Sequence, residues 1–349
     1  MFLLWVFALL LVDKAASLLQ TTKPAVRGSL SPLIPPQASE IEEPRAQEFL
    51  QKIRSATVKV PASIAPSQVV ETAYARFESS KKSSSKSGGW FGIGLGKQKK
   101  GPIVLLHGFD SSSCEYRRLA PLLAEEGDRD VIVPDLLGWG FTRPPEDIAS
   151  YGPEAKMEHL RCFIQQVCGG NSQPVTVVGA SLGGALGIIL AAESPRLVDR
   201  LVLIDAQGFI DGKGPSDIPV PLARLGVNVL KSSPLRMFAN LLAYRNKSFA
   251  TVDAMRVGRL HCFTPTWETA SIDFLRSGGF SPSSFVAQVA QDTLLLWGRN
   301  DEILEPGTAQ RFVETMPKCR LEMVEECGHV PHLEKPQLSA TLILDFLQG

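Results

Sequence analysis

The stretch that decides the fold is residues 175–184, which read VTVVGASLGG. Its first four residues are β-branched and predict a buried strand, which runs directly into the motif GASLG at 179–183. Glycines on both sides of Ser181 permit a sharp turn in which backbone passes close to backbone. The apolar residues at 183–193 then predict a helix, whose N-terminus favours developing negative charge. The stretch therefore predicts a strand, a tight turn and a helix, with Ser181 at the turn as a candidate nucleophile.

Short runs rich in Val, Ile and Leu recur on both sides of this unit. Such runs are typical of strands that are buried on both faces of a parallel sheet. Segments with one apolar stripe at helical spacing separate them. We therefore expect an α/β fold with a doubly wound, mostly parallel sheet. The expected strands are 71–78, 103–106, 131–133, 175–178, 201–204, 293–297 and 321–324, and the expected helices are 153–168, 183–193, 308–316 and 336–347.

Residues 207–281 interrupt this alternation. They carry no strong strand signal and consist of helix-like pieces broken by Gly and Pro. We expect a helical cap here, inserted into a single α/β domain that covers residues 66–349. Residues 18–65 are expected to precede that domain as a transit-like or linker segment.

The first residues resemble a targeting signal. Residues 1–12 read MFLLWVFALLLV, an apolar run too short to span a bilayer comfortably, and small residues follow at 15–17. Residues 18–39 are rich in Ser, Thr and Pro and contain no acid, which is typical of a transit peptide. We expect a signal peptide over 1–17 and delivery to a plastid through this bipartite presequence. The secretory pathway or an extracellular location is the alternative.

The composition of the chain argues against several classes of binding partner. The 349 residues include 36 basic and 36 acidic side chains, and the formal net charge of zero argues against general nucleic-acid binding. The six cysteines show no C-x-x-C spacing, and no metal-binding or nucleotide-binding motif is present, so we expect neither a metal nor a cofactor. Residues 79–100 are a low-complexity loop with six lysines and no acid, either a solvated loop or a peripheral membrane contact. The oligomeric state stays open.

A serine nucleophile needs a base and an acid that orients the base. His329 lies in CGHV at 327–330, directly after the last expected strand. Asp301 follows the strand 293–297 through a turn, and the chain order Ser, Asp, His suits this fold. Asp205 also ends a strand and is the second choice for the acid. His332 is a rival base that we expect to be structural, like His159 and His261.

Acyl transfer also needs donors for the oxyanion. The backbone N–H of Leu182 is one candidate, and the N–H of Phe109 is the other, in the oxyanion loop HGFD at 107–110. We expect His107 to hold that loop in place by hydrogen bonding. The candidate substrate pocket consists of Trp139, Phe141, Phe238 and Trp267, for which plain packing is the alternative.

In combination, these motifs resemble the α/β-hydrolase superfamily, in its esterase and lipase-like branch with a helical cap. The resemblance covers about residues 70–349. Within the superfamily, the sequence is similar to cyanobacterial and plastid members. It implies a serine hydrolase that cleaves an ester of an apolar small molecule or lipid, such as a plastid lipid or phytyl ester, through an acyl-enzyme. A carbon–carbon or thioester hydrolase and a receptor-like protein without turnover are the alternatives. The motifs are HGFD at 107–110, DLLGWG at 135–140, GASLGG at 179–184, LVLIDA at 201–206, WGRNDEI at 297–303 and CGHVPHLEKP at 327–336.

Overall fold

An eight-stranded sheet organises the chain, with strand order β1-β2-β4-β3-β5-β6-β7-β8. The computed structural model describes residues 30–81, 100–170 and 172–349. Strand β2 pairs with β1 on one side and with β4 on the other, both in antiparallel fashion, whereas all pairs from β4 to β8 are parallel. The strands are β1 (Ile53–Lys59), β2 (Val69–Phe77), β3 (Ile103–Leu106), β4 (Val131–Pro134), β5 (Val175–Ala180), β6 (Val198–Ile204), β7 (Asp292–Gly298) and β8 (Cys319–Val324).

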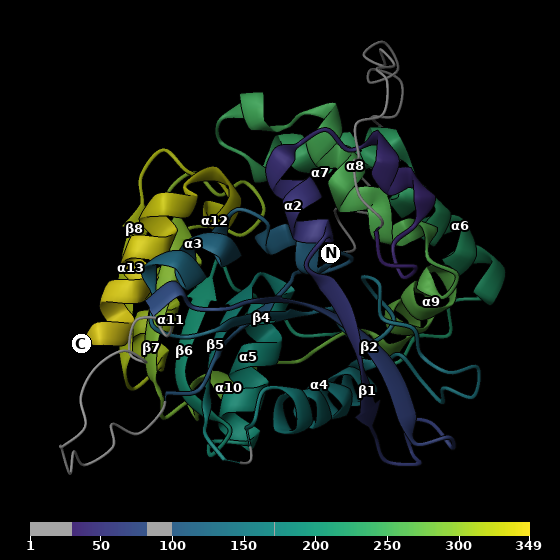
Figure 1. Cartoon of the computed structure of the whole chain (residues 1–349), viewed down its shortest axis with the longest axis horizontal. Helices are drawn as coiled ribbons and strands as arrows, with labels where there is room; N and C mark the ends of the chain where they lie inside the picture. Colours follow the sequence, from purple (N-terminus) through teal and green to yellow (C-terminus); the bar gives the residue numbers. More distant parts are fainter. Residues whose placement is uncertain (1–29, 82–99, 171) are drawn as a thin grey trace, which may run out of the picture.

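Helices cover both faces of the sheet (Figure 1). Every residue of β3, β4 and β5 is buried, as expected for central parallel strands. The alternating side chains of each strand divide the core into two clusters, one on each face. The expected doubly wound α/β fold is therefore confirmed. One face carries α4 (Pro153–Val167), α5 (Leu182–Glu193), α10 (Ser283–Val286) and α11 (Gly307–Thr315), and the other carries α3 (Leu119–Glu126) and α13 (Pro336–Gln348).

The insertion between β6 and β7 is helical and lies to one side of the sheet (Figure 1). Thr251 caps α8 by accepting a hydrogen bond from the backbone N–H of Ala254, and Gly278 ends α9 with a positive φ of 85°. The helices of this cap are α6 (Val220–Lys231), α7 (Ser233–Ala243), α8 (Val252–Arg259) and α9 (Trp267–Ser277), with the short 3₁₀ turn η6 (Leu260–Phe263) after α8.

The expected domain boundary at residue 66 is wrong, because residues 30–65 are part of the fold. Strand β1 pairs along its whole length with β2, and Phe49 and Leu50 of α2 (Pro44–Leu50) are buried in the core. The sequence of β1, IRSATVK, buries only two of its seven side chains, so its apolar pattern is too weak to reveal an edge strand.

Several predictions concern residues outside the described part. Residues 1–29, which carry the predicted signal and the start of the transit-like segment, and residues 82–99 of the basic loop are not among the described residues. Within the described ranges, no helix combines the length and the apolar character needed to cross a membrane.

Candidate active site

Ser181 sits on a strained turn between β5 and α5. Its φ is 50° and its ψ is −117°, values that few non-glycine residues adopt. The backbone crossing at this turn leaves no room for a side chain at the neighbouring glycines. A Cβ on Gly183 would lie 2.0 Å from the carbonyl oxygen of Leu106, and one on Gly179 would lie 2.3 Å from that of Gly183. The GASLG motif therefore holds the Ser181 hydroxyl at the carboxyl end of β5, next to the N-terminus of α5.

His329 and Asp301 meet at the ends of the neighbouring strands β7 and β8. His329 Nδ1 lies 2.7 Å from Asp301 Oδ2, and the other oxygen of Asp301 accepts hydrogen bonds from the N–H groups of Ile303 and Leu304 at 2.7 and 3.0 Å. The Nδ1 contact leaves Nε2 available. Ser181 and His329 line one cavity, although no direct hydrogen bond joins them among the described residues. Such bonds often close only around substrate.

Asp205 lies beside this pair, so the second-choice acid belongs to the same cluster. Ligand atoms of Asp205, Asp301 and His329 all lie within 4.8 Å of one another. Asp205 accepts a hydrogen bond from the Gly298 N–H at 2.9 Å. Burial, and then the neighbouring carboxylate of Asp301, raise the pKa of Asp205 well above its usual value. The raised pKa favours the neutral form of Asp205, and Asp301 is the acid whose carboxylate faces the imidazole.

The oxyanion loop, residues 107–110, is held in place by hydrogen bonds of the His107 side chain. His107 Nε2 accepts from the Leu136 N–H at 3.1 Å, so Nδ1 carries the proton that is donated to the Gly108 carbonyl at 2.9 Å. Burial lowers the pKa of His107 to about 4, which keeps the ring neutral. The geometry fits the expected loop-holding role. Phe109 lines the cavity, and a Cβ on Gly108 would lie 3.5 Å from that of Ser181. Leu182 begins α5, where N–H groups lack helical partners.

Glu115 is a support of this loop that the sequence analysis missed. Its Oε2 accepts from the Gly108 N–H at 3.0 Å, and its Oε1 lies 3.3 Å from His332 Nε2. Burial would raise the pKa of Glu115, but the contact with His332 lowers it to about 2. Glu115 is therefore a charged acceptor under the loop. His332 has the structural position expected of it, as does His159, whose Nε2 lies 2.8 Å from Thr72 Oγ1.

A cavity of about 480 Å³ lies between the sheet and the cap. Ser181, His329 and Phe109 contribute to its walls, together with apolar side chains of the cap helices. Of the four expected pocket aromatics, Phe238 lines this cavity. Its apolar lining from the cap includes Leu222, Leu225, Val229, Leu230, Leu235, Phe238, Leu242 and Met255.

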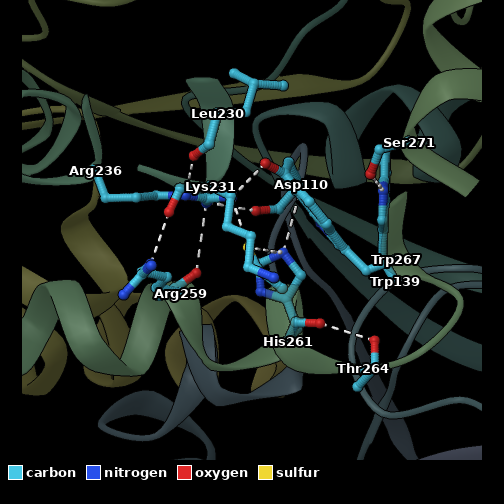
Figure 2. Close-up of polar contacts among 12 residues, drawn as sticks. Asp110, Trp139, Leu230, Lys231, Arg236, Arg259, His261, Thr264, Trp267 and Ser271 are labelled. Atoms are coloured by element: carbon cyan, nitrogen blue, oxygen red, sulfur yellow. Dashed lines mark hydrogen bonds and ion pairs between the residues drawn. The ribbon is translucent and has the colours of Figure 1, made fainter. Parts of the chain in front are cut away.

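The other three expected pocket aromatics, Trp139, Phe141 and Trp267, are not among the residues that line this cavity. All three are almost fully buried. Trp139 packs edge-on against Phe109 and donates from Nε1 to Ser271 Oγ at 3.3 Å (Figure 2). The backbone N–H of Phe141 donates to the Asp135 carboxylate, which folds the loop 135–141 inward. Sequence alone does not separate aromatic packing from a pocket wall, because both bury the ring.

Known proteins resemble this chain over the same region. The family described as "alpha/beta hydrolase fold" matches residues 101–336. The "Alpha/beta hydrolase domain-containing protein VTE7" of Arabidopsis thaliana is 37% identical over 72% of this chain and 75% of that protein. "Lipase 1" of Psychrobacter immobilis is 29% identical over 67% of this chain and 72% of that protein. A crystal structure of a putative lipase from Acinetobacter baumannii has a TM-score of 0.63 at 21% identity, covering 88% of this chain and 97% of that one.

Proposed function

Because the chain belongs to the α/β-hydrolase fold family and resembles lipases, we propose that it is a serine hydrolase that cleaves a carboxylic ester. The 2.7 Å contact between Asp301 and His329 carries this proposal, since Ser181 lines the same cavity from its strained turn. An orienting carboxylate, an imidazole and a hydroxyl on one cavity are the requirements of acyl transfer.

The proposed reaction passes through an acyl-enzyme. His329 Nε2 takes the proton of Ser181 as its hydroxyl attacks the ester carbonyl, and Asp301 stabilises the imidazolium. The N–H groups of Phe109 and Leu182 bind the oxyanion. His329 then gives its proton to the departing alcohol. Water attacks the acyl-enzyme with His329 again as base, and the acid product leaves.

The substrate we propose is an ester with a long apolar group. Support comes from the cap, which adds mainly Leu, Val, Met and Phe side chains to the cavity of about 480 Å³. Such a wall favours an acyl or isoprenoid chain over a charged substrate. The resemblance to plastid proteins makes a plastid lipid or phytyl ester our first choice, with action in the plastid. We also propose that the basic loop, residues 79–100, contacts a membrane surface. Most of this loop lies outside the described residues.

The test is labelling of the purified protein with a fluorophosphonate beside the variant Ser181→Ala. We expect labelling of the wild type that is lost in the variant, followed by turnover that increases from acetyl to long-chain and phytyl esters. Labelling without turnover of any ester would favour a carbon–carbon or thioester hydrolase. A folded wild type that is not labelled would contradict the proposal and favour a receptor-like protein.

A further inference from the structure

Asp110, the residue after the proposed oxyanion donor, is a buried carboxylate on which the cap converges. Only 4% of its surface is exposed, and its φ of 48° is unfavourable for a residue with a side chain. Oδ1 accepts from Trp267 Nε1 at 2.7 Å and contacts His261 Nε2 at 3.0 Å, while Oδ2 accepts from Arg236 Nη2 (Figure 2). All three partners belong to the cap, so one carboxylate of the oxyanion loop joins three cap segments.

Arg236, near the start of α7, is the hub of these contacts. Its Nη1 donates to the backbone carbonyl of Asp110 at 3.0 Å, and its Nε donates to the Leu230 carbonyl at the end of α6 at 2.8 Å (Figure 2). The same guanidinium reaches the Gly258 carbonyl of α8 at 3.4 Å and Cys262 Sγ at 3.0 Å. Because Arg236 binds both the carboxylate and the carbonyl of residue 110, it restrains the backbone directly after Phe109.

The other end of α7 contacts the loop that carries the proposed base. The backbone N–H of His329 donates to the carbonyl of Ala243, the last residue of α7, at 2.8 Å. A Cβ on Gly328 would lie 2.3 Å from that carbonyl, so the two backbones are in direct contact. Glu334 accepts from the N–H groups of Gly328 and Arg245 at 2.9 and 3.1 Å and ties both segments together. At about 1.5 Å per residue, α7 spans roughly 10 Å between Arg236 and Ala243.

We infer that Asp110 is a positioning residue: through Arg236 and α7, it fixes the Phe109 N–H relative to His329, so the cap sets the oxyanion site as well as covering the substrate. This inference rests on the proposed function. Helix α7 is the rigid element between the two loops, and Asp110 is the side chain through which the oxyanion loop is attached to it.

Two observations indicate that the Asp110 carboxylate attaches the oxyanion loop to the cap and does not bind a ligand. Asp110, His261 and Cys262 could hold a metal ion by geometry, but the Arg236 guanidinium already donates to Asp110 and Cys262. Burial would raise the pKa of Asp110, yet Arg236 and His261 lower it. Burial would also lower the pKa of His261, whereas Cys262 and Asp110 raise it to about 9. The carboxylate is thus charged and bound by two cations.

The test compares variants in the wild-type background. Asp110→Asn removes the charge and keeps a similar shape, Arg236→Gln removes the guanidinium, and a third variant combines both. Asp253→Asn is the matched control, because Asp253 of α8 also anchors the cap, accepting from the N–H groups of Glu42 and Glu43 at 2.9 and 2.5 Å, away from the oxyanion loop. Each variant is assayed for kcat, KM, melting temperature, and inhibition by a trifluoromethyl ketone and by the product acid.

We expect Asp110→Asn to lower kcat by about 10- to 100-fold, because a misplaced donor costs less than the 10²–10³ of a lost one. KM and inhibition by the product acid should change by less than about threefold. The trifluoromethyl ketone, which forms an oxyanion on Ser181, should bind more weakly by the same factor as kcat. The double variant should be no slower than the slower single variant, because both changes break one coupling.

Three results would overturn the inference. The first is a fall in kcat for Asp110→Asn that equals the fall for Asp253→Asn. The others are a change in KM without a change in kcat, and a double variant whose loss of kcat equals the two single losses combined. Where Asp110→Asn does not fold, Arg236→Gln and Arg236→Lys decide, and wild-type kcat in Arg236→Gln overturns the inference. A wild type that fails to react with fluorophosphonate contradicts the proposed function instead, so the two failures are distinguishable.

Discussion

Lys156 on α4 is a fully buried lysine beside the wall of the oxyanion site. Its Nζ donates to the Leu137 carbonyl and lies 3.8 Å from the centre of the Trp139 ring, which packs against Phe109. Burial lowers its pKa from 10.5 to about 7, although Asp273 and Asp110 oppose the change. We predict that Lys156→Met stabilises the protein at pH 7 and that the gain shrinks as the pH rises.

The magnitude follows from the two pKa values. The difference between 10.5 and about 7, at about 1.36 kcal/mol per pH unit, makes the buried charge cost on the order of 5 kcal/mol. Methionine removes that cost but leaves the Leu137 carbonyl unpaired, which costs about 1–3 kcal/mol. It also loses a cation–π contact worth about 1–2 kcal/mol. The expected net gain in the free energy of unfolding at pH 7 is therefore about 0–3 kcal/mol, with a midpoint of about 1.5 kcal/mol.

The pH dependence has a defined sign. The unfolded chain holds the Lys156 proton more tightly than the native chain, so this residue makes wild-type stability rise from about pH 7 to pH 10. Methionine does not titrate. The advantage of Lys156→Met should therefore fall by about 2 kcal/mol between pH 7 and pH 9, where it disappears or reverses.

Urea unfolding of both proteins at pH 7, 8 and 9, followed by fluorescence, measures this difference. Comparison at each pH is the control, because other titrating groups are common to both proteins. His261, for example, has its pKa raised to about 9, so its contribution is lost above that pH in both. A variant that is less stable than the wild type at pH 7, or a difference that is constant from pH 7 to pH 9, would refute the reasoning.

Three further predictions concern the site. Asp205→Asn should keep activity within about threefold, because the raised pKa of Asp205 favours a neutral group that an amide of the same shape can replace, whereas Asp205→Ala should lose about tenfold in kcat/KM; a large loss with Asn would mean that Asp205 acts as a carboxylate. Gly183→Ala should fail to yield soluble protein, since its Cβ would meet the Leu106 carbonyl at 2.0 Å; a normal melting temperature would contradict this. Phe238→Ala should lower the ratio of kcat/KM for long over short p-nitrophenyl esters by about tenfold, because it removes apolar contact with the long chain; an unchanged ratio would remove Phe238 from the acyl site.

The three residues of the proposed triad could be predicted to meet because each follows a strand. Ser181, Asp301 and His329 stand after β5, β7 and β8, and parallel strands bring their carboxyl ends to one edge of the sheet. Correct prediction of the strands therefore sufficed to bring the three residues to one edge. The same reasoning fails for β1, because an edge strand with most side chains exposed has no alternating apolar pattern. It fails for the cap as well, because its helices can pack on the sheet in several ways.

The contacts of Asp110 show what sequence reasoning lacks. The sequence indicated a loop aspartate, a structural histidine and a pocket tryptophan as separate features, yet His261 and Trp267 meet the Asp110 carboxylate across 151 and 157 residues of chain. Burial is the missing information, since a carboxylate removed from water must be paired and hydrogen-bonded. Once Asp110 is known to be 4% exposed, donors from the cap become a physical requirement. A buried charge on a loop thus predicts that whatever covers it also positions that loop, and here the covering helix α7 contacts the loop of the proposed base.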